Sequence, residues 1–191
     1  TGAHEVIVTI MLNYVALLSL TWLLSTPAFL RPGRIDPIAP VIDPTAAFPI
    51  IFKQLNVGFL VALLAAAAVW WLLDRSTLGF QIRAVGSNPA AAGTAGMSVP
   101  TTTIITMTLS GMLAGLAGVQ AALGPGADGV ATPLSLGLVG TIGFDAITVA
   151  LLGRSKPLGI VFAGLLFGGL HSGGLAMQNI VGTPLTLSTV L

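Results

Sequence analysis

Few side chains in this sequence have the types and spacing needed for covalent or metal chemistry. The 191 residues contain two histidines and no cysteine, which excludes thiolate metal sites and cysteine nucleophiles. His4 and Glu5 are adjacent, but no second histidine completes the zinc-protease pattern H-E-x-x-H. His171 and Ser110 are far apart in the sequence, and no pattern places them together. We therefore assign no catalytic residue and no metal ligand.

A second group of polar side chains suits hydrogen bonding to a neutral polar molecule. These residues interrupt long apolar runs, where polar side chains are costly and are candidates for function by default. The candidates for a substrate path are Asn13, Tyr14, Ser110 and Gln120. Asn13 lies in the middle of its run, and hydrogen bonding between helices explains it as well as a substrate path does.

Composition indicates that lipid surrounds most of this chain. Hydrophobic residues make up 54% of the sequence and charged residues 7%, whereas about a quarter of a soluble domain is charged. The net charge of +1 provides none of the basic clusters that nucleic acid requires. We predict an integral membrane protein that contacts lipid and binds no nucleic acid.

Three apolar runs approach the roughly 20 residues that cross a bilayer as a helix. They cover residues 6–24, 57–73 and 101–123. Gly111 and Gly115, in the third run, have the small-xxx-small spacing that lets membrane helices approach closely. Residues 26–56 contain many prolines, so we expect an irregular loop outside the membrane there.

The remainder of the chain also consists mainly of apolar runs, but a Gly-rich stretch interrupts them. Residues 124–143 are Gly-rich and nearly uncharged, which indicates an interrupted or re-entrant helix sheltered by protein. An apolar run at 144–153, the basic turn "RSKP", a further span at 158–177 and a final helix beginning at 185 follow. The predicted fold is an all-α polytopic bundle, a single transmembrane domain over 1–191 that we expect to be part of a longer protein.

Basic residues indicate the orientation. If the N-terminal end of the first span faces the cytoplasm, the loop at 26–56 is extracytoplasmic and residues 74–100 are cytoplasmic. The cytoplasmic segments then hold Arg75, Arg83, Arg154 and Lys156, against Arg31, Arg34 and Lys53 outside. The positive-inside rule favours this orientation.

The segment at 79–100 carries a complete set of signals for a short helix. Asn88 is a favoured N-cap, Pro89 suits the first helical position, and Gly96 offers a left-handed stop. We predict a self-contained helix over residues 88–95, too short to cross the bilayer. Its Ala and Gly surface suits a groove in another protein better than it suits lipid, although a plain linker remains the alternative.

This segment resembles the cytoplasmic coupling segment of ABC-importer permeases for branched-chain amino acids, simple sugars and nucleosides. The family pattern is matched by Gly79, Arg83, Ala84, Gly86, Asn88, Ala91, Ala92 and Gly96. Residues 2–16, 143–170 and 173–184 are similar to the nucleoside and simple-sugar branch, in the right order. The sequence "AGTAGMSV" departs from the pattern, because a charged or aromatic residue is expected near Gly93.

The resemblance implies a type II importer-like fold in the cytoplasmic membrane of a prokaryote. It implies cytoplasmic ATP-binding subunits that dock on the coupling segment, with Arg83, Gly86, Asn88, Pro89, Ala91, Ala92 and Gly96 as the coupling residues. Arg83 would pair there with acidic groups of the ATPase or with lipid phosphate. A second permease subunit, identical or different, and an extracytoplasmic substrate-binding lipoprotein complete the implied assembly.

Three function classes therefore compete. The resemblance favours a permease that imports a nucleoside or simple sugar and needs no cofactor of its own, because ATP would be bound by the partner subunits. The chain lacks the G-x-x-x-x-G-K-[ST] phosphate loop of such subunits. A gradient-driven carrier is the alternative, but its spans would usually carry charged residues along the ion path. An intramembrane enzyme is the third class.

Overall fold

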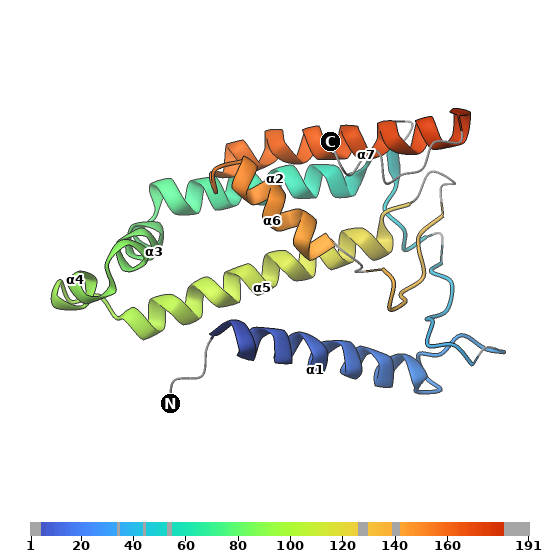
Figure 1. The fold of residues 1–191 in the computed structure, drawn as a ribbon, viewed down its shortest axis with the longest axis horizontal. Coiled ribbons are helices and arrows are strands. Elements are labelled where there is room, and N and C mark those ends of the chain that lie inside the picture. The colour runs from blue at the N-terminus through green and yellow to red at the C-terminus, as the bar shows by residue number, and fades with distance from the viewer. Residues whose placement is uncertain are drawn as a thin grey trace. The chain divides into compact units, whose positions relative to one another are not determined.

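The computed structural model describes residues 5–33, 35–43, 45–52, 55–125, 130–138 and 142–181. Within these ranges, four helices are long and apolar enough to cross a membrane (Figure 1). They are α1 (Glu5–Ser25), α2 (Val57–Arg75), α5 (Val99–Leu123) and α7 (Pro157–Val181). The predicted spans are thereby confirmed to within a few residues at each end. The predicted helix start at residue 185 lies outside the described residues.

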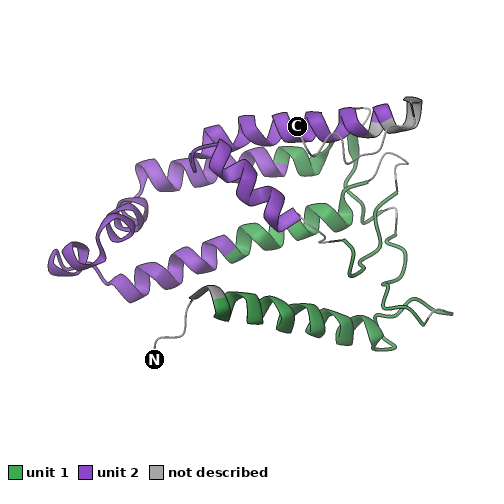
Figure 2. Ribbon diagram, viewed as in Figure 1, with its two compact units in different colours: residues 1–60, 111–140 green, residues 61–110, 141–191 purple. Residues whose placement is uncertain are grey.

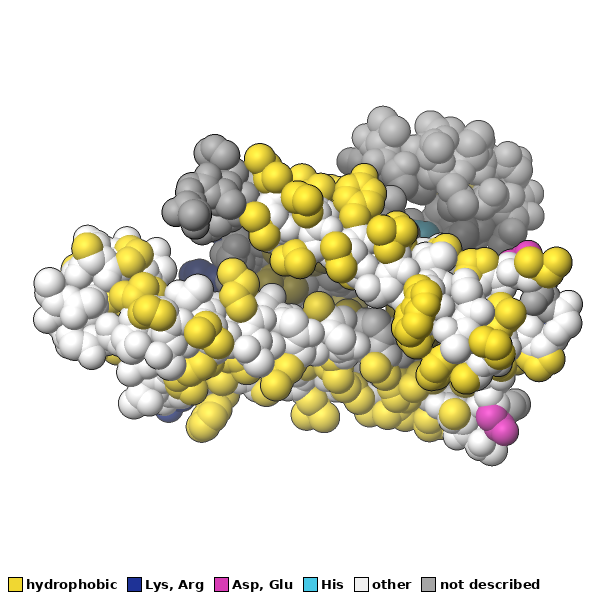
Figure 3. All heavy atoms as spheres, turned by 90° about the horizontal axis from the view of Figure 1, so that it is seen from below, with side chains coloured by type: hydrophobic (Ala, Val, Ile, Leu, Met, Phe, Trp, Pro, Cys, Tyr) yellow, Lys and Arg dark blue, Asp and Glu magenta, His cyan; other side chains and the backbone are white. Residues whose placement is uncertain are grey.

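The helices expose large apolar side chains rather than burying them. Trp22 and Phe162 each expose more than 70% of their surface (73% and 72%), whereas Leu24 and Ala163 are buried. Figure 3 shows hydrophobic side chains spread over the visible face, with charged groups few and scattered. A water-facing surface of this kind would aggregate, so lipid or other protein must cover it.

The chain divides into two compact units, each built from separate parts of the sequence (Figure 2). The first comprises Thr1–Leu60 and Gly111–Gly140. It contains α1 and the short antiparallel strands β1 (Ile50–Phe52) and β2 (Leu55–Asn56). The sequence did not indicate these strands; the rest of the proline-rich loop is largely irregular, as predicted.

Backbone hydrogen bonds tie the proline-rich loop to the last residue of α5 and to the segment that follows it. The N–H of Ala39 donates to the carbonyl of Leu134 (2.9 Å), and the N–H of Phe48 donates to that of Leu123 (3.0 Å). Within the loop, the backbone N–H of Thr45, and then its hydroxyl, donate to the Asp43 carboxylate and lower its pKa. The loop is thus ordered by local and long-range polar contacts despite its prolines.

Within the stretch 124–143, the described residues that precede α6 are not helical, as the sequence indicated. The described residues 130–138 form turns and isolated bridges, including one between Ser135 and Ile38. Helix α6 (Ile142–Leu152) follows and is 11 residues long. At 1.5 Å per residue it spans roughly 16 Å, about half of a bilayer core.

The second unit comprises Val61–Ser110 and Thr141–Leu191. Here α6 and α7 pack against each other across the basic turn. Arg154 and Ser155 adopt left-handed backbone conformations (φ 54° and 53°), which reverse the chain sharply. Gly153 and Gly159 meet so closely that a Cβ on Gly159 would strike the carbonyl oxygen of Gly153. This unit also holds the helices α3 (Thr77–Ser87) and α4 (Pro89–Thr94), which join α2 to α5.

Candidate functional site

Helix α4 begins as its sequence predicts. Asn88 has an extended backbone (φ −154°), and its Oδ1 accepts a hydrogen bond from the backbone N–H of Ala91 (3.1 Å). Pro89 occupies the first helical position, where its missing N–H leaves no bond unmade. Asn88 also ends the preceding helix, because its own N–H donates to the carbonyl of Ala84 (3.1 Å). One residue therefore closes α3 and opens α4.

The C-terminal end of α4 forms a Schellman motif. The N–H of Met97 donates to the carbonyl of Ala92 (3.0 Å), and the N–H of Gly96 donates to that of Gly93 (3.1 Å). Gly96 has φ +83°, the left-handed conformation that glycine adopts without steric cost. The predicted glycine stop is confirmed.

Helices α3 and α4 are in contact, and each buries one apolar side chain. Ala92 is buried on α4 and Val85 is buried on α3 (4% and 9% exposed). The other residues of α4 are exposed: Pro89, Ala90, Ala91, Gly93 and Thr94. We call these five residues the α4 face; no bulky side chain would keep another protein away from it.

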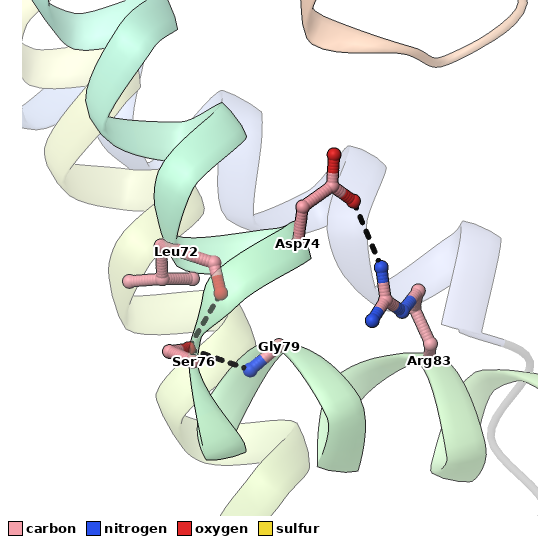
Figure 4. A network of polar contacts seen from close by, with 5 residues as sticks. All are labelled: Leu72, Asp74, Ser76, Gly79 and Arg83. Carbon is pink, nitrogen blue, oxygen red and sulfur yellow. Dashed lines mark hydrogen bonds and ion pairs between the residues drawn. The ribbon is translucent and has the colours of Figure 1, made fainter.

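Helix α3 was not predicted from the sequence, and it explains how α4 is attached to a span. Ser76 is the sole residue between α2 and α3 and is the N-cap of α3. Its hydroxyl donates to the carbonyl of Leu72 (2.5 Å) and accepts from the N–H of Gly79 (3.0 Å), as Figure 4 shows. We call residues 72–79 the elbow. The signal was present in the sequence, since Ser76 precedes a helix-compatible run.

Gly79 lets the two helices meet closely at the elbow. A Cβ on Gly79 would strike the carbonyl oxygens of Leu72 and Leu73 and would lie 2.6 Å from the Cα of Leu73. These are backbone atoms, which cannot rotate away as a side chain would. A glycine is therefore required here by close approach, and Gly79 is the first residue of the family pattern.

Arg83 has a partner within the chain that the sequence did not indicate. Its Nη1 lies 2.9 Å from Oδ1 of Asp74, at the end of α2 (Figure 4). Both side chains are about half exposed (53% and 49%), and exposed pairs of this kind contribute about 0–1 kcal/mol to stability. The two sequence hypotheses, pairing with an ATPase or with lipid phosphate, remain predictions.

The candidate path residues lie on two helices, α1 and α5. Asn13 and Tyr14 are exposed on α1, and Ser110 is exposed on α5. Among the described residues, no hydrogen bond joins any of these side chains to another or to Gln120. Their assignment to a substrate path therefore stays a prediction.

Gln120, near the end of α5, lies in a tightly built polar contact within the first unit. Its Nε2 donates to Oδ1 of Asn56 (3.1 Å), and Asn56 is buried (9% exposed). The Gln120 carboxamide occupies the space where a side chain on Gly58 would lie, and Gly124 leaves room on the other side. Its Oε1 is buried and accepts no hydrogen bond from any residue that the structure describes.

We predict that Gly58→Ala destabilises this contact. The new methyl group displaces the Gln120 carboxamide and breaks its hydrogen bond to Asn56, at a cost of about 0.5–1.5 kcal/mol. The unfolding temperature in detergent should fall by a few degrees. Gly118→Ala on α5 is the matched control, because no described atom lies within 4 Å of its Cβ position. An unchanged melting temperature for Gly58→Ala would show that the contact carries no stability.

The fold and the coupling segment together define an all-α, multi-pass membrane protein in which two spans are joined by a pair of short, capped helices. The family model described as the permease component of branched-chain amino acid transport systems matches residues 1–191. The chain belongs to this family of permeases, and it is a multi-pass protein of the prokaryotic cytoplasmic membrane.

Individual relatives agree with the family. The guanosine ABC transporter permease protein NupP of Bacillus subtilis is 40% identical over 95% of this chain and 52% of its own length. The nucleoside ABC transporter permease protein NupB of Lactococcus lactis is 37% identical over 93% of this chain and 50% of its own length. A glucose ABC transporter permease protein of Haloferax volcanii is 29% identical over 98% and 51%. The chain thus spans about half the length of the relatives it matches. No solved structure matches it.

Proposed function

We propose that this chain is part of a permease subunit of an ATP-driven importer that moves a nucleoside across the cytoplasmic membrane, with a simple sugar as the related cargo. The observation that carries the proposal is the capped helix α4, held between two spans of a chain that belongs to a permease family. The relatives named for guanosine and nucleoside transport are 40% and 37% identical and cover more than nine-tenths of this chain. They favour nucleoside over sugar.

The α4 face is the proposed docking surface for cytoplasmic ATP-binding subunits. It is exposed, small-sided and held in one conformation by caps at both ends. ATP-driven closure of those subunits would move α4, and the spans would follow between outward-open and inward-open states. A second permease subunit and an extracytoplasmic substrate-binding lipoprotein complete the proposed assembly, in which this subunit hydrolyses nothing itself.

Co-purification from the native membrane tests the proposal. The full-length protein is extracted in mild detergent, and its partners are identified by mass spectrometry. We expect an ATPase with a phosphate-binding loop and, after reconstitution, nucleoside uptake that requires ATP. A protein that purifies alone and moves solute in liposomes without ATP would instead be a gradient-driven carrier.

Asn13 provides a test of the substrate path. We predict that Asn13→Leu lowers nucleoside uptake about tenfold while the ATPase still co-purifies, because the path loses a hydrogen-bonding group worth about 1 kcal/mol or more. Leu12→Ile, on the neighbouring exposed position of α1, is the control for an altered helix surface. Uptake unchanged by Asn13→Leu would mean that Asn13 holds helices together and does not touch cargo.

A further inference from the structure

We propose that Asp74 and Arg83 are a pair of positioning residues that hold α3 and α4 at a set angle to the end of α2. The pair would make span α2 and helix α4 move as one body. The role of the pair in transport rests on the proposed function, because the pair would transmit the movement of a docked ATPase to a span. Neither residue needs to touch the ATPase or the cargo for this role.

Very short connections favour such a rigid body. One residue, Ser76, separates α2 from α3, and one residue, Asn88, separates α3 from α4. Both residues cap helices through their side chains, at Gly79 and Ala91 respectively. A connection of one residue with its side chain engaged has few backbone torsions left to absorb a displacement.

The elbow alone fixes only the vertex between α2 and α3. The contacts of Ser76 lie at that vertex, whereas Arg83 lies about one turn beyond Gly79 along α3. Figure 4 shows the Arg83 side chain reaching back across the open side of the angle to Asp74 on the last turn of α2. Two separated attachments resist bending between the helices, and a single attachment does not.

The pairing also changes what Arg83 is available to do. Its Nη1 already donates to Asp74 at 2.9 Å, so an acidic group of a partner would have to share the guanidinium with Asp74. The geometry therefore assigns Arg83 first to the chain's own α2. If the two residues act as one pair, removing either charge has the same effect, and exchanging the two charges restores function.

The first experiment measures the angle directly and needs no ATPase. The 191 residues contain no cysteine, so spin labels can be placed at Leu64→Cys on α2 and Ala90→Cys on α4, both exposed, once any cysteine elsewhere in the full-length protein is replaced. We expect a narrow distance distribution by pulsed electron resonance. Asp74→Asn and Arg83→Gln should each broaden it about twofold, and the exchange Asp74→Arg with Arg83→Asp should narrow it again.

The second experiment uses the reconstituted complex. Asp74→Asn and Arg83→Gln should each retain the bound ATPase and its ATP hydrolysis while nucleoside uptake falls about two- to fivefold, and the charge exchange should recover most of the uptake. An undisturbed distance distribution in both single variants would overturn the proposal. So would loss of ATPase binding in Arg83→Gln but not in Asp74→Asn, since Arg83 would then contact the ATPase. If the distances respond as expected but no ATPase binds the unmodified protein, the proposed importer fails and the positioning pair stands.

Discussion

ATP-dependent uptake should fall to background when residues 88–95 are replaced by a Gly/Ser linker of equal length. The linker removes the Asn88 cap, the α4 face and the buried Ala92 side chain, so the proposed ATPase has no ordered surface to bind. Insertion should be unaffected, because each flanking span retains its own apolar length. Uptake, ATPase co-purification and membrane content are measured in the same preparations.

Two single substitutions at Asn88 test whether uptake depends on the helical structure of α4, because they change its N-cap and leave the rest of α4 unchanged. Asn88→Ala removes the acceptor for the Ala91 N–H and should cost α4 about 1 kcal/mol, whereas Asn88→Ser keeps an acceptor at the cap. We expect uptake to fall several-fold in the alanine variant and to remain near normal in the serine variant. Normal uptake with the full linker replacement would show that α4 merely connects two spans.

The sequence predicted α4 well because all its signals are local. Asn88, Pro89 and Gly96 lie within nine positions, and each acts on neighbouring backbone groups, so no tertiary contact is needed to interpret them. The spans were predictable for a similar reason, since the thickness of the bilayer sets the length of the apolar run. Local backbone capping determines the residues around α4, and bilayer thickness determines the length of the apolar runs. Neither depends on tertiary contacts.

Contacts between residues far apart in the sequence could not be predicted in the same way. Gln120 was a candidate because a polar residue in a span is unusual, but nothing local indicates that its partner is Asn56, 64 positions earlier. Arg83 was likewise a predicted coupling residue, but its pairing with Asp74 was not predicted. That pairing depends on a turn at Ser76 that directs α3 back toward α2. The angle between two helices has no signature in a periodic pattern.

Gly79 belongs to a local sequence pattern and also takes part in a contact that the sequence did not predict. In the sequence it is an ordinary glycine at the start of a pattern, and in the structure it is where the backbone at the end of α2 leaves no room for a side chain on α3. The close approach also places the N–H of Gly79 against the hydroxyl of Ser76. A larger residue would move the start of α3 and, with it, the reach of Arg83 to Asp74.

We therefore expect Gly79→Ala to be among the most damaging single substitutions in this segment. Its methyl group meets the carbonyl oxygens of Leu72 and Leu73, and because backbone atoms must shift, the cost should be about 1–3 kcal/mol or more. Gly86→Ala is the matched control for stability, since it lies in the same helix with no described atom within 4 Å of its Cβ position. Thermal unfolding in detergent should fall by several degrees for Gly79→Ala and remain level or rise for Gly86→Ala, because alanine favours helix over glycine. Equal melting temperatures for the two variants would mean that α3 can move away from α2 freely, and the elbow would then be a hinge.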